Sequence, residues 1–330
     1  MKYNYCTLFD KNYLPHVLSL HDSLLDTVTD FTLYCLCMDE ESHQYLQTMT
    51  SDSIIPISYH EIENHYPDLL IAKKNRSRVE YYFTCSSAIC SYVFDCFQEI
   101  TFLTYLDADL YFFSSPKPIY DELKEASVGI IEHAFSFFGK RYLKYGRFNV
   151  GWVSFRNDQS GRKCLEDWRK NCIEWCYDRL ENGKFADQKY LDYWSNNYSG
   201  VHIIKHPGAN VGPWNVGFFR LKINPDKKQI FVNNQSLIFY HFASFKQVDS
   251  HGYITNVSKY LTPLVGILRH DIYLPYLKNL IKYNKILSQK FNHKDRSEKI
   301  NSSLEYKIKN ASRNLRKFIC RDYIKFDILD

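Results

Sequence analysis

The chain has 330 residues, 45% of them hydrophobic and 24% charged, which is typical of a globular protein with a sizeable core. It contains no run of about 18 apolar residues, which excludes a transmembrane helix. The first ten residues lack the apolar region of a signal peptide, so we expect a cytoplasmic protein. The ten cysteines include no C-x-x-C pair, which favours reduced core thiols over disulfides or a zinc site.

The first part of the chain alternates strand-like and helix-like segments. Strands are predicted at 2–9, 31–38, 100–107, 127–133 and 147–156, and helices at 13–26, 80–97 and 161–183. Shorter strands are predicted at 201–204, 217–223, 229–233 and 237–242, with a hairpin turn at 224–229. This alternation favours an α/β fold with a largely parallel sheet.

The pattern changes at about residue 256. Residues 258–290 are predicted to be helical, 291–303 to be a polar linker, and 304–326 to form a second basic amphipathic segment. Residues 269–330 hold 15 Lys and Arg against 7 Asp and Glu, whereas residues 1–268 carry a balance of −3 within the net charge of +5. A basic amphipathic helix is typical of membrane-surface binding. A solvated helical extension or an oligomer contact explains the tail equally well. No nucleic-acid partner is expected, because no binding module accompanies the charge.

Two carboxylates, Asp107 and Asp109, follow directly on the apolar strand in the segment YLDADLYFF. Alternate residues of an extended segment point the same way, so the two side chains are expected on one side. Ligands gather at the carboxyl ends of strands in α/β sheets, and paired carboxylates suit a hard cation such as Mg²⁺ or Mn²⁺. A pair of exposed turn carboxylates is the simpler interpretation of an isolated D-x-D.

The segment YLDADLYFFSSP resembles the D-x-D segment of GT-A glycosyltransferases, especially glycosyltransferase family 8 and related bacterial transferases. Five further segments resemble motifs of that family in the same order, over roughly residues 3–250. They are YCTLFDKNYLPHVLSLHDSL, KNRSRVEYYFTCSS, FNVGWVSF, FADQKYLDYW and FYHFASFK. The chain departs from the family at Lys189, where an Asp is usual, at Ser244 in place of Gly, and in the spacing of Lys246 from His241.

The resemblance implies a Rossmann-like mixed sheet of GT-A type flanked by helices, with a catalytic domain over 1–255 and a basic helical extension over 256–330. It implies metal-dependent transfer of a sugar, with retention, from a UDP-sugar to a glycan or lipid-linked acceptor. Such an acceptor belongs to the synthesis of cell-surface polysaccharide or lipopolysaccharide. If the acceptor is lipid-linked, binding of the basic C-terminal tail to the inner face of the cell membrane would hold the enzyme where its acceptor lies.

The same resemblance assigns expected roles to individual residues. Mn²⁺ or Mg²⁺ is expected on Asp107, Asp109 and His241. Donor contacts are expected from Thr7, Phe9, Asp10, Tyr13, Arg76, Arg78, Ala108, Asn149 and Lys246. Asp187 and Gln188 are expected beside the transferred sugar. Two roles follow from the residues and not from the resemblance: Glu132, a carboxylate at a strand end, is a candidate base if the enzyme inverts, and Trp214 is a candidate sugar-stacking ring in a glycine-rich loop that is expected to be mobile. Structural roles compete with several of these: core packing for Phe9 and Trp214, surface charge for Arg76, Arg78 and Lys246, and a helix N-cap for Asp187.

Two other classes of protein are compatible with parts of the pattern. Phosphatases of the haloacid dehalogenase type also carry D-x-D after a strand, but on their first strand and followed by Thr or Val rather than Leu110. A non-catalytic GT-A scaffold that binds a sugar nucleotide or a partner is the second alternative. Lys189 and the altered Lys246 segment keep this alternative open.

Overall fold

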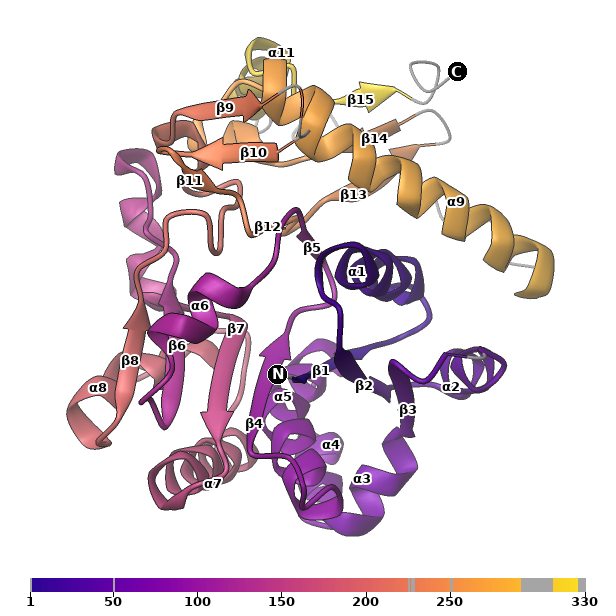
Figure 1. Ribbon diagram of the computed structural model, residues 1–330, viewed down its shortest axis with the longest axis vertical. Coiled ribbons are helices and arrows are strands. Elements are labelled where there is room, and N and C mark those ends of the chain that lie inside the picture. Colours follow the sequence, from indigo (N-terminus) through magenta and orange to yellow (C-terminus); the bar gives the residue numbers. More distant parts are fainter. Residues whose placement is uncertain are drawn as a thin grey trace.

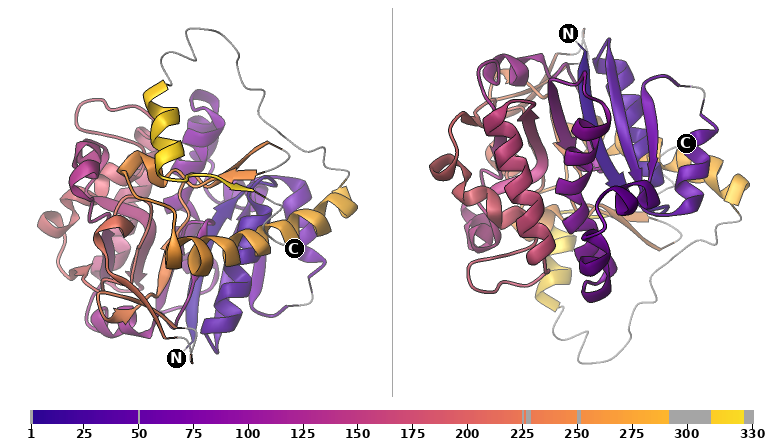
Figure 2. Two further views of the ribbon diagram at one scale, coloured as in Figure 1. Left: turned by 90° about the horizontal axis from the view of Figure 1, so that it is seen from above. Right: turned by 90° about the horizontal axis from the view of Figure 1, so that it is seen from below.

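The computed structural model describes residues 2–49, 51–224, 226, 229–249, 252–291 and 311–325. Most of the predicted linker, 292–303, and the first part of the second basic segment, 304–310, lie outside the described residues. Figure 1 shows the arrangement of helices and strands, and Figure 2 shows it from above and below.

The main sheet has seven strands in the order β3-β2-β1-β4-β7-β6-β8. They are β1 (Tyr3–Phe9), β2 (Phe31–Cys37), β3 (Ile54–Ser58), β4 (Phe102–Leu106), β6 (Val128–Glu132), β7 (Phe148–Arg156) and β8 (Val201–Ile204). Neighbouring strands are parallel except that β7 runs antiparallel to both β4 and β6. The sheet is therefore mixed, as expected for a GT-A fold, and the expectation of a largely parallel sheet fails only at β7.

Helices cover both faces of this sheet (Figure 2). They are α1 (Leu14–Thr27), α2 (Glu40–Gln47), α3 (Tyr59–His65), α4 (Leu69–Asn75), α5 (Arg78–Cys96), α6 (Lys117–Glu122), α7 (Gln159–Glu174) and α8 (Trp194–Asn197). Successive residues of a strand point to opposite faces. On β1, Tyr5 enters the core under α1, and Cys6 enters the core under α5 and α7. Both faces are thus buried, which explains the continuous apolar runs of the strands.

Helix α7 corrects one sequence prediction. The predicted helix ran to Gly183, but α7 ends at Glu174 because Trp175 is extended, with φ −150° and ψ 114°. Cys176 is nevertheless buried, so apolar residues continue past the helix end because they pack, not because they are helical. The guanidinium of Arg76 donates to the carbonyl oxygens of Ile173 and Glu174, at 3.1 and 3.2 Å, and so caps the last turn.

The remaining described elements are short strands and two further α-helices, and all of them except β5 lie in the last third of the chain. The elements are β5 (Leu110–Phe112), β9 (Leu221–Asn224), β10 (Gln229–Val232), β11 (Gln235–Ser236), β12 (Phe239–His241), β13 (Lys246–Asp249), β14 (Gly252–Ile254), β15 (Ile324–Lys325), α9 (Leu274–Phe291) and α11 (Ala311–Ile319). Antiparallel pairing of β9 with β10 confirms the predicted hairpin. Strand β12 pairs with β5, directly after the D-x-D segment, and α9 packs on α1 (Figure 1).

The described part of the C-terminal extension shares a core with residues before 255. Tyr276 and Ile324 are buried with Val211 and Tyr240. The buried carboxylate of Asp322 accepts hydrogen bonds from the backbone and hydroxyl groups of both Thr255 and Ser258. The division at residue 255 stays a prediction.

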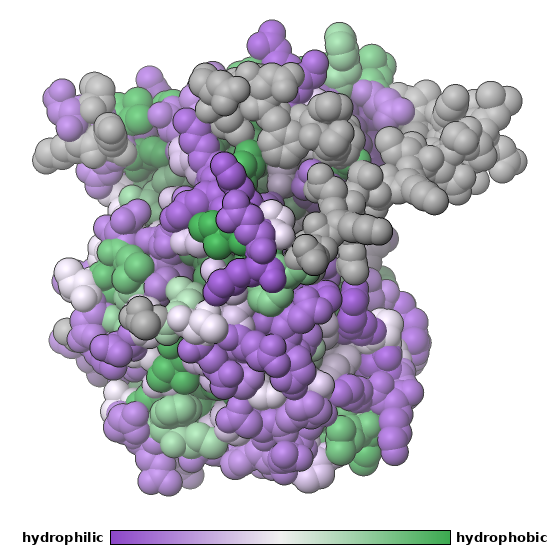
Figure 3. Space-filling view, turned by 90° about the vertical axis from the view of Figure 1, so that its right-hand side faces the viewer, coloured by the Kyte–Doolittle hydropathy of each residue, from purple (hydrophilic) through white to green (hydrophobic). Residues whose placement is uncertain are grey.

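Two further properties concern the hydrophobicity of the helices and of the surface. Among the described residues, no helix has both the length and the apolar character needed to cross a membrane. The described part of the face in Figure 3 is mainly hydrophilic, with only small separate hydrophobic areas.

Candidate functional site

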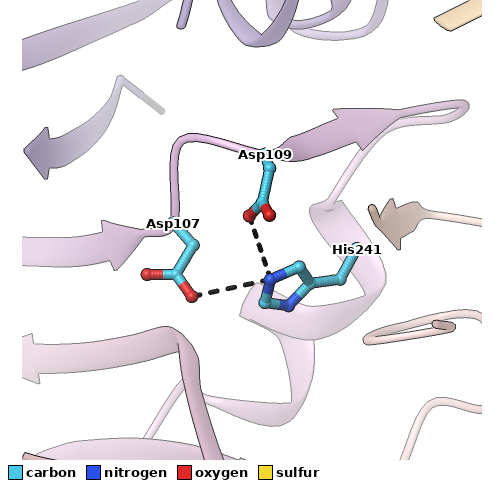
Figure 4. Close-up of side chains that lie close together, drawn as sticks. All are labelled: Asp107, Asp109 and His241. Atoms are coloured by element: carbon cyan, nitrogen blue, oxygen red, sulfur yellow. Dashed lines mark ion pairs between the residues drawn. The ribbon is translucent and has the colours of Figure 1, made fainter. Parts of the chain in front are cut away.

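Asp107, Asp109 and His241 form a cluster at the carboxyl end of β4 (Figure 4). The Nε2 atom of His241 lies 3.0 Å from Oδ1 of Asp109 and 3.6 Å from Oδ2 of Asp107. The two Asp residues flank a tight turn in which the backbone N–H of Leu110 donates to the carbonyl oxygen of Asp107. Pairing of β5 with β12 places His241 opposite Leu110. The pairing of β12 with β5 therefore brings His241 to two carboxylates that precede it by more than 130 positions in the sequence.

The charges of these three groups depend strongly on one another. Burial raises the pKa of Asp107 to about 6, with Asp109 adding to the shift and His241 opposing it. Burial also acts to raise the pKa of Asp109, but the charge and hydrogen bond of His241 outweigh it and lower the pKa. Burial alone would lower the pKa of His241, and the two carboxylates raise it instead. The imidazole and the two carboxylates thus favour one another's charged forms, and a divalent cation would favour the charged carboxylates in the same way.

The donor set fits a hard divalent cation. One atom from each of the three side chains lies within 4.8 Å of the other two, so two carboxylate oxygens and one imidazole nitrogen can reach a common point. Oxygen with imidazole suits Mg²⁺ or Mn²⁺, which keep further positions for water or phosphate oxygens. Ala108, between the two carboxylates, is buried.

Polar side chains orient His241 on the side of the ring opposite the two carboxylates. The side-chain amide of Asn149 lies 3.2 Å from Nδ1 of His241, which leaves Nε2 to face the carboxylates. Asn149 also contacts the side chain of Asn210 at 3.1 Å and accepts from the backbone N–H of Gly151 at 2.7 Å. Gly151 has no space for a side chain, because a Cβ there would lie 2.7 Å from the imidazole. Asn149 and Gly151 of the segment FNVG therefore fix the orientation of the His241 ring.

Trp214, which was expected to contact the acceptor, lies beside His241. Its buried ring stands edge-on to His241 at 5.2 Å, and its indole N–H has no hydrogen-bond partner among the described residues. The glycines of its loop serve close packing: a Cβ on Gly208 would lie 1.9 Å from the carbonyl oxygen of Ser236, and one on Gly212 would lie 2.7 Å from the indole. The expectation that these glycines make the loop mobile does not agree with this packing.

Asp187 lies close enough to Asp107 for their charges to interact. Burial, and then the charge of Asp107, raise the pKa of Asp187 to about 7. The side-chain amide of Gln188 donates to the carbonyl oxygen of Tyr145 at 3.3 Å. Lys189, at the position where the family has an Asp, forms a 2.7 Å ion pair with Asp192.

Asp10, Arg78 and Tyr13 lie at the end of β1, where a nucleoside was expected. The buried carboxylate of Asp10 accepts from the backbone and side chain of Asn12, and lies 4.0 Å from the guanidinium of Arg78. Arg78 also lines a pocket of about 330 Å³ with Met38, Tyr59, Lys73, Arg76, Tyr81 and Tyr82. The ring of Tyr13 is 43% exposed, so it is available for stacking.

The structure gives the following surroundings for the other predicted residues. Phe9 is part of the hydrophobic core, and the hydroxyl of Thr7 is fully buried. Arg76 caps α7 and packs its guanidinium 3.9 Å from the ring centroid of Tyr177. Glu132 is held in a 2.6 Å ion pair by Arg147. Lys246 is exposed at the start of β13.

Three polar residues near the cluster were not predicted from the sequence to be functional. They are His16, His133 and Asn210. Asn210 carries the one available signal, a polar residue inside the apolar loop sequence GANVGPW. The two histidines lie in segments without any pattern that marks a ligand.

Comparison with known proteins places the chain in a family. Over 287 residues it is 30% identical to the uncharacterized protein YfnD of Bacillus subtilis (strain 168), covering 85% of this chain and 89% of YfnD. It is 31% identical over 297 residues to the uncharacterized protein YfnF of the same strain, covering 87% of this chain and 96% of YfnF. The chain belongs to the YfnD–YfnF family. No family model matches the sequence.

The fold of this YfnD–YfnF family member is that of GT-A glycosyltransferases. Its structure is similar to that of the galactosyltransferase LgtC, solved in complex with donor and acceptor sugar analogs, with a TM-score of 0.52 and 14% identity. The similarity covers 84% of this chain and 95% of LgtC. The family resemblance of the D-x-D segment thus extends to the whole architecture.

Proposed function

We propose that this protein is a metal-dependent glycosyltransferase that moves a sugar from a UDP-sugar to a glycan or lipid-linked acceptor. The observation that carries the proposal is the Asp107–Asp109–His241 cluster at the carboxyl end of β4 in a GT-A fold. Sugar transfer from a nucleotide donor leaves a diphosphate, whose negative charge grows as the glycosidic bond breaks. A divalent cation on the cluster would supply Lewis-acid stabilisation of that charge.

The donor would extend from the end of β1 to the cluster. Asp10 and Arg78, which lie 4.0 Å apart, would bind ribose hydroxyls, and the exposed Tyr13 would stack on the base. The pocket of about 330 Å³ beside them is large enough for a nucleobase. Lys246 would add positive charge near the diphosphate. Membership of glycosyltransferase family 8 is part of this proposal.

The transferred sugar would lie against Asp187, Gln188 and Asn149. Asp187, with a pKa of about 7, can accept or donate a hydrogen bond to a sugar hydroxyl near neutral pH. Retention of configuration is proposed, because the base role of Glu132 in an inverting reaction would require its ion pair with Arg147 to break. Trp214 would face the acceptor.

A lipid-linked acceptor is supported by the surface of α11. Leu315, Phe318 and Ile319 are 58%, 82% and 64% exposed, and Arg313, Arg316 and Lys317 lie on the same short helix. Apolar and basic side chains together suit the surface of an anionic membrane, where each cation contributes about 1 kcal/mol. We propose that the protein acts in the cytoplasm, at the inner face of the membrane.

The test is release of UDP from a panel of UDP-sugars with Mn²⁺ or EDTA, for wild type, Asp109→Asn and the exposed control Asp121→Asn. We expect slow hydrolysis of one donor, lost in EDTA and reduced at least roughly 100-fold in Asp109→Asn only. Binding of UDP without turnover of any donor would favour a non-catalytic scaffold. The Lys189–Asp192 ion pair makes that outcome a specific alternative. Absence of both turnover and metal-dependent UDP binding would overturn the proposal.

A further inference from the structure

A hydrogen bond joins the first helix of the chain to the C-terminal extension beside the candidate site. Nδ1 of His16, on α1, lies 2.6 Å from the hydroxyl of Tyr276, on α9. The two helices pack against each other, with a 2.9 Å ion pair between Lys282 and Asp22 further along (Figure 1).

The ring of Tyr276 is fixed by its surroundings. It is fully buried and stacks on Phe242, with ring centroids 3.7 Å apart and an interplanar angle of 16°. Phe242 follows His241 directly, and its backbone N–H donates to the carbonyl oxygen of Asp109 at 2.9 Å. The hydroxyl of Tyr276 therefore has a defined position relative to two of the three proposed metal ligands.

The chemistry of the pair determines where the protons lie. Burial raises the pKa of the Tyr276 phenol, so the phenol keeps its proton. Burial lowers the pKa of His16 to about 4, against a small opposing effect of Asp109, so the imidazole is neutral. Nδ1 of His16 is the partner that the structure gives the phenol, so the phenol donates and Nδ1 accepts. The ring proton of His16 is then on Nε2.

The imidazole of His16 contacts Tyr13 and lies within range of the charge of Asp109. Tyr13, the expected base-stacking residue, stacks on His16 with ring centroids 4.7 Å apart and an angle of 29°. The charge of Asp109 acts on both rings. His16 is half-buried. A nucleotide that stacks on Tyr13 and reaches the cluster would bring its phosphates past His16.

We propose that His16 binds the donor, with its Nε2–H donating a hydrogen bond to a phosphate oxygen of the nucleoside diphosphate. Tyr276 is a positioning residue that fixes this tautomer and the orientation of the ring. This inference rests on the proposed function. It assigns to helix α9 a part in the donor site, so the C-terminal extension completes the site in addition to covering α1.

The test compares three variants with wild type by calorimetric titration of Mn²⁺ alone and of UDP in saturating Mn²⁺. His16→Ala removes the donor, whereas His16→Gln keeps an N–H close to the Nε2 position. Tyr276→Phe removes the hydroxyl but keeps the stack on Phe242. The matched control is Tyr273→Phe in the same C-terminal segment. It also removes a buried tyrosine hydroxyl, which forms a 3.0 Å hydrogen bond with the hydroxyl of Tyr240.

We expect UDP affinity to fall roughly 5- to 20-fold in His16→Ala and about 3- to 10-fold in Tyr276→Phe. His16→Gln should recover most of the loss, Tyr273→Phe should bind UDP like wild type, and Mn²⁺ affinity should not change in any variant. ¹⁵N spectra of labelled histidine should show the Nε2–H tautomer of His16 in wild type and a mixture in Tyr276→Phe.

The outcomes separate this inference from the proposed function. If wild type binds no UDP in Mn²⁺, both fail. If wild type binds UDP and His16→Ala binds it equally well, the inference alone fails. It also fails if Mn²⁺ affinity falls as much as UDP affinity, because the effect is then a general disturbance of the site.

Discussion

The imidazole of His241 lies 3.0 Å from the carboxylate of Asp109, and only the pairing of β12 with β5 brings them together. If His241 and Asp109 both bind the metal ion, His241→Asn should lower Mn²⁺ affinity at least roughly tenfold. Titration calorimetry measures it, with the exposed His270→Asn as control. Saturating Mn²⁺ at about 100 times its Kd should stabilise wild type by about 2.7 kcal/mol. Equal stabilisation of His241→Asn would exclude His241 as a ligand.

The lack of space at Gly151 gives a second prediction. In Gly151→Ala the new methyl group would lie 2.7 Å from the His241 ring, so the imidazole must leave the position in which its Nε2 faces the carboxylates. Mn²⁺ affinity should fall about tenfold or more. The control is Gly129→Ala on the neighbouring strand, where the methyl would meet the Leu123 side chain at 2.6 Å. It should reduce stability and leave Mn²⁺ affinity unchanged. The same loss of affinity in both variants would contradict the proposed role of Gly151.

Asp187 predicts an unusual dependence of stability on pH. Burial, with the charge of Asp107, raises its pKa from 3.8 to about 7. A carboxyl group whose pKa is raised by folding favours the folded state when protonated. Its contribution is therefore complete below about pH 4 and is lost as the pH rises through 7. Asp187→Asn stays neutral, so at pH 8 in EDTA it should be more stable than wild type by on the order of 1–3 kcal/mol.

Urea unfolding at pH 4.5 and pH 8 measures this difference. The gain from Asp187→Asn should be small at pH 4.5, where the wild-type carboxyl is already protonated. The exposed control Asp121→Asn should change stability little at either pH. A gain for Asp187→Asn that is the same at both pH values would show that the titration of Asp187 is not its cause.

The exposed side chains of α11 predict binding to anionic membranes. The full chain should sediment with phosphatidylglycerol vesicles and not with phosphatidylcholine vesicles, and less in high salt, because the cations of the helix are screened. Phe318→Ser should reduce the bound fraction several-fold. Phe218→Ser removes another exposed ring, 59% exposed and outside α11, and should bind like wild type. Equal binding of the two variants would mean that α11 is not the contact.

The sequence predicted the strands of the main sheet and the acidic pair well because both have local causes, whereas the predicted strand at 217–223 begins in a 3-10 helix and becomes extended only at Leu221. Strand β4 is a buried and mainly apolar run, and the charged residues Asp107 and Asp109 follow at its end. Both features are visible in the sequence of this one segment. His241 was found through the order of motifs, not through any property of its own segment. The end of α7 was missed because buried residues such as Cys176 continue the apolar spacing beyond the helix.

Contacts between distant segments could not be read from the sequence. The hydrogen bond between His16 and Tyr276 joins residues 260 positions apart, and no pattern in either segment indicates that the two are in contact. The role of Asn149 as a support for His241 depends on the register of β7 against β4, which strand prediction does not give. The capping role of Arg76 depends on where α7 ends.

The position of the third proposed ligand has a consequence for the growing polypeptide. A ribosome makes Asp107 and Asp109 early, but strand β7, which lies beside β4, and strand β12, which carries His241, emerge much later. Helix α9, which packs on α1, emerges later still. A nascent chain therefore has no complete cation site until most of its length has left the exit tunnel. Premature termination before residue 241 would yield a chain without the third proposed ligand, and so no prematurely active fragment.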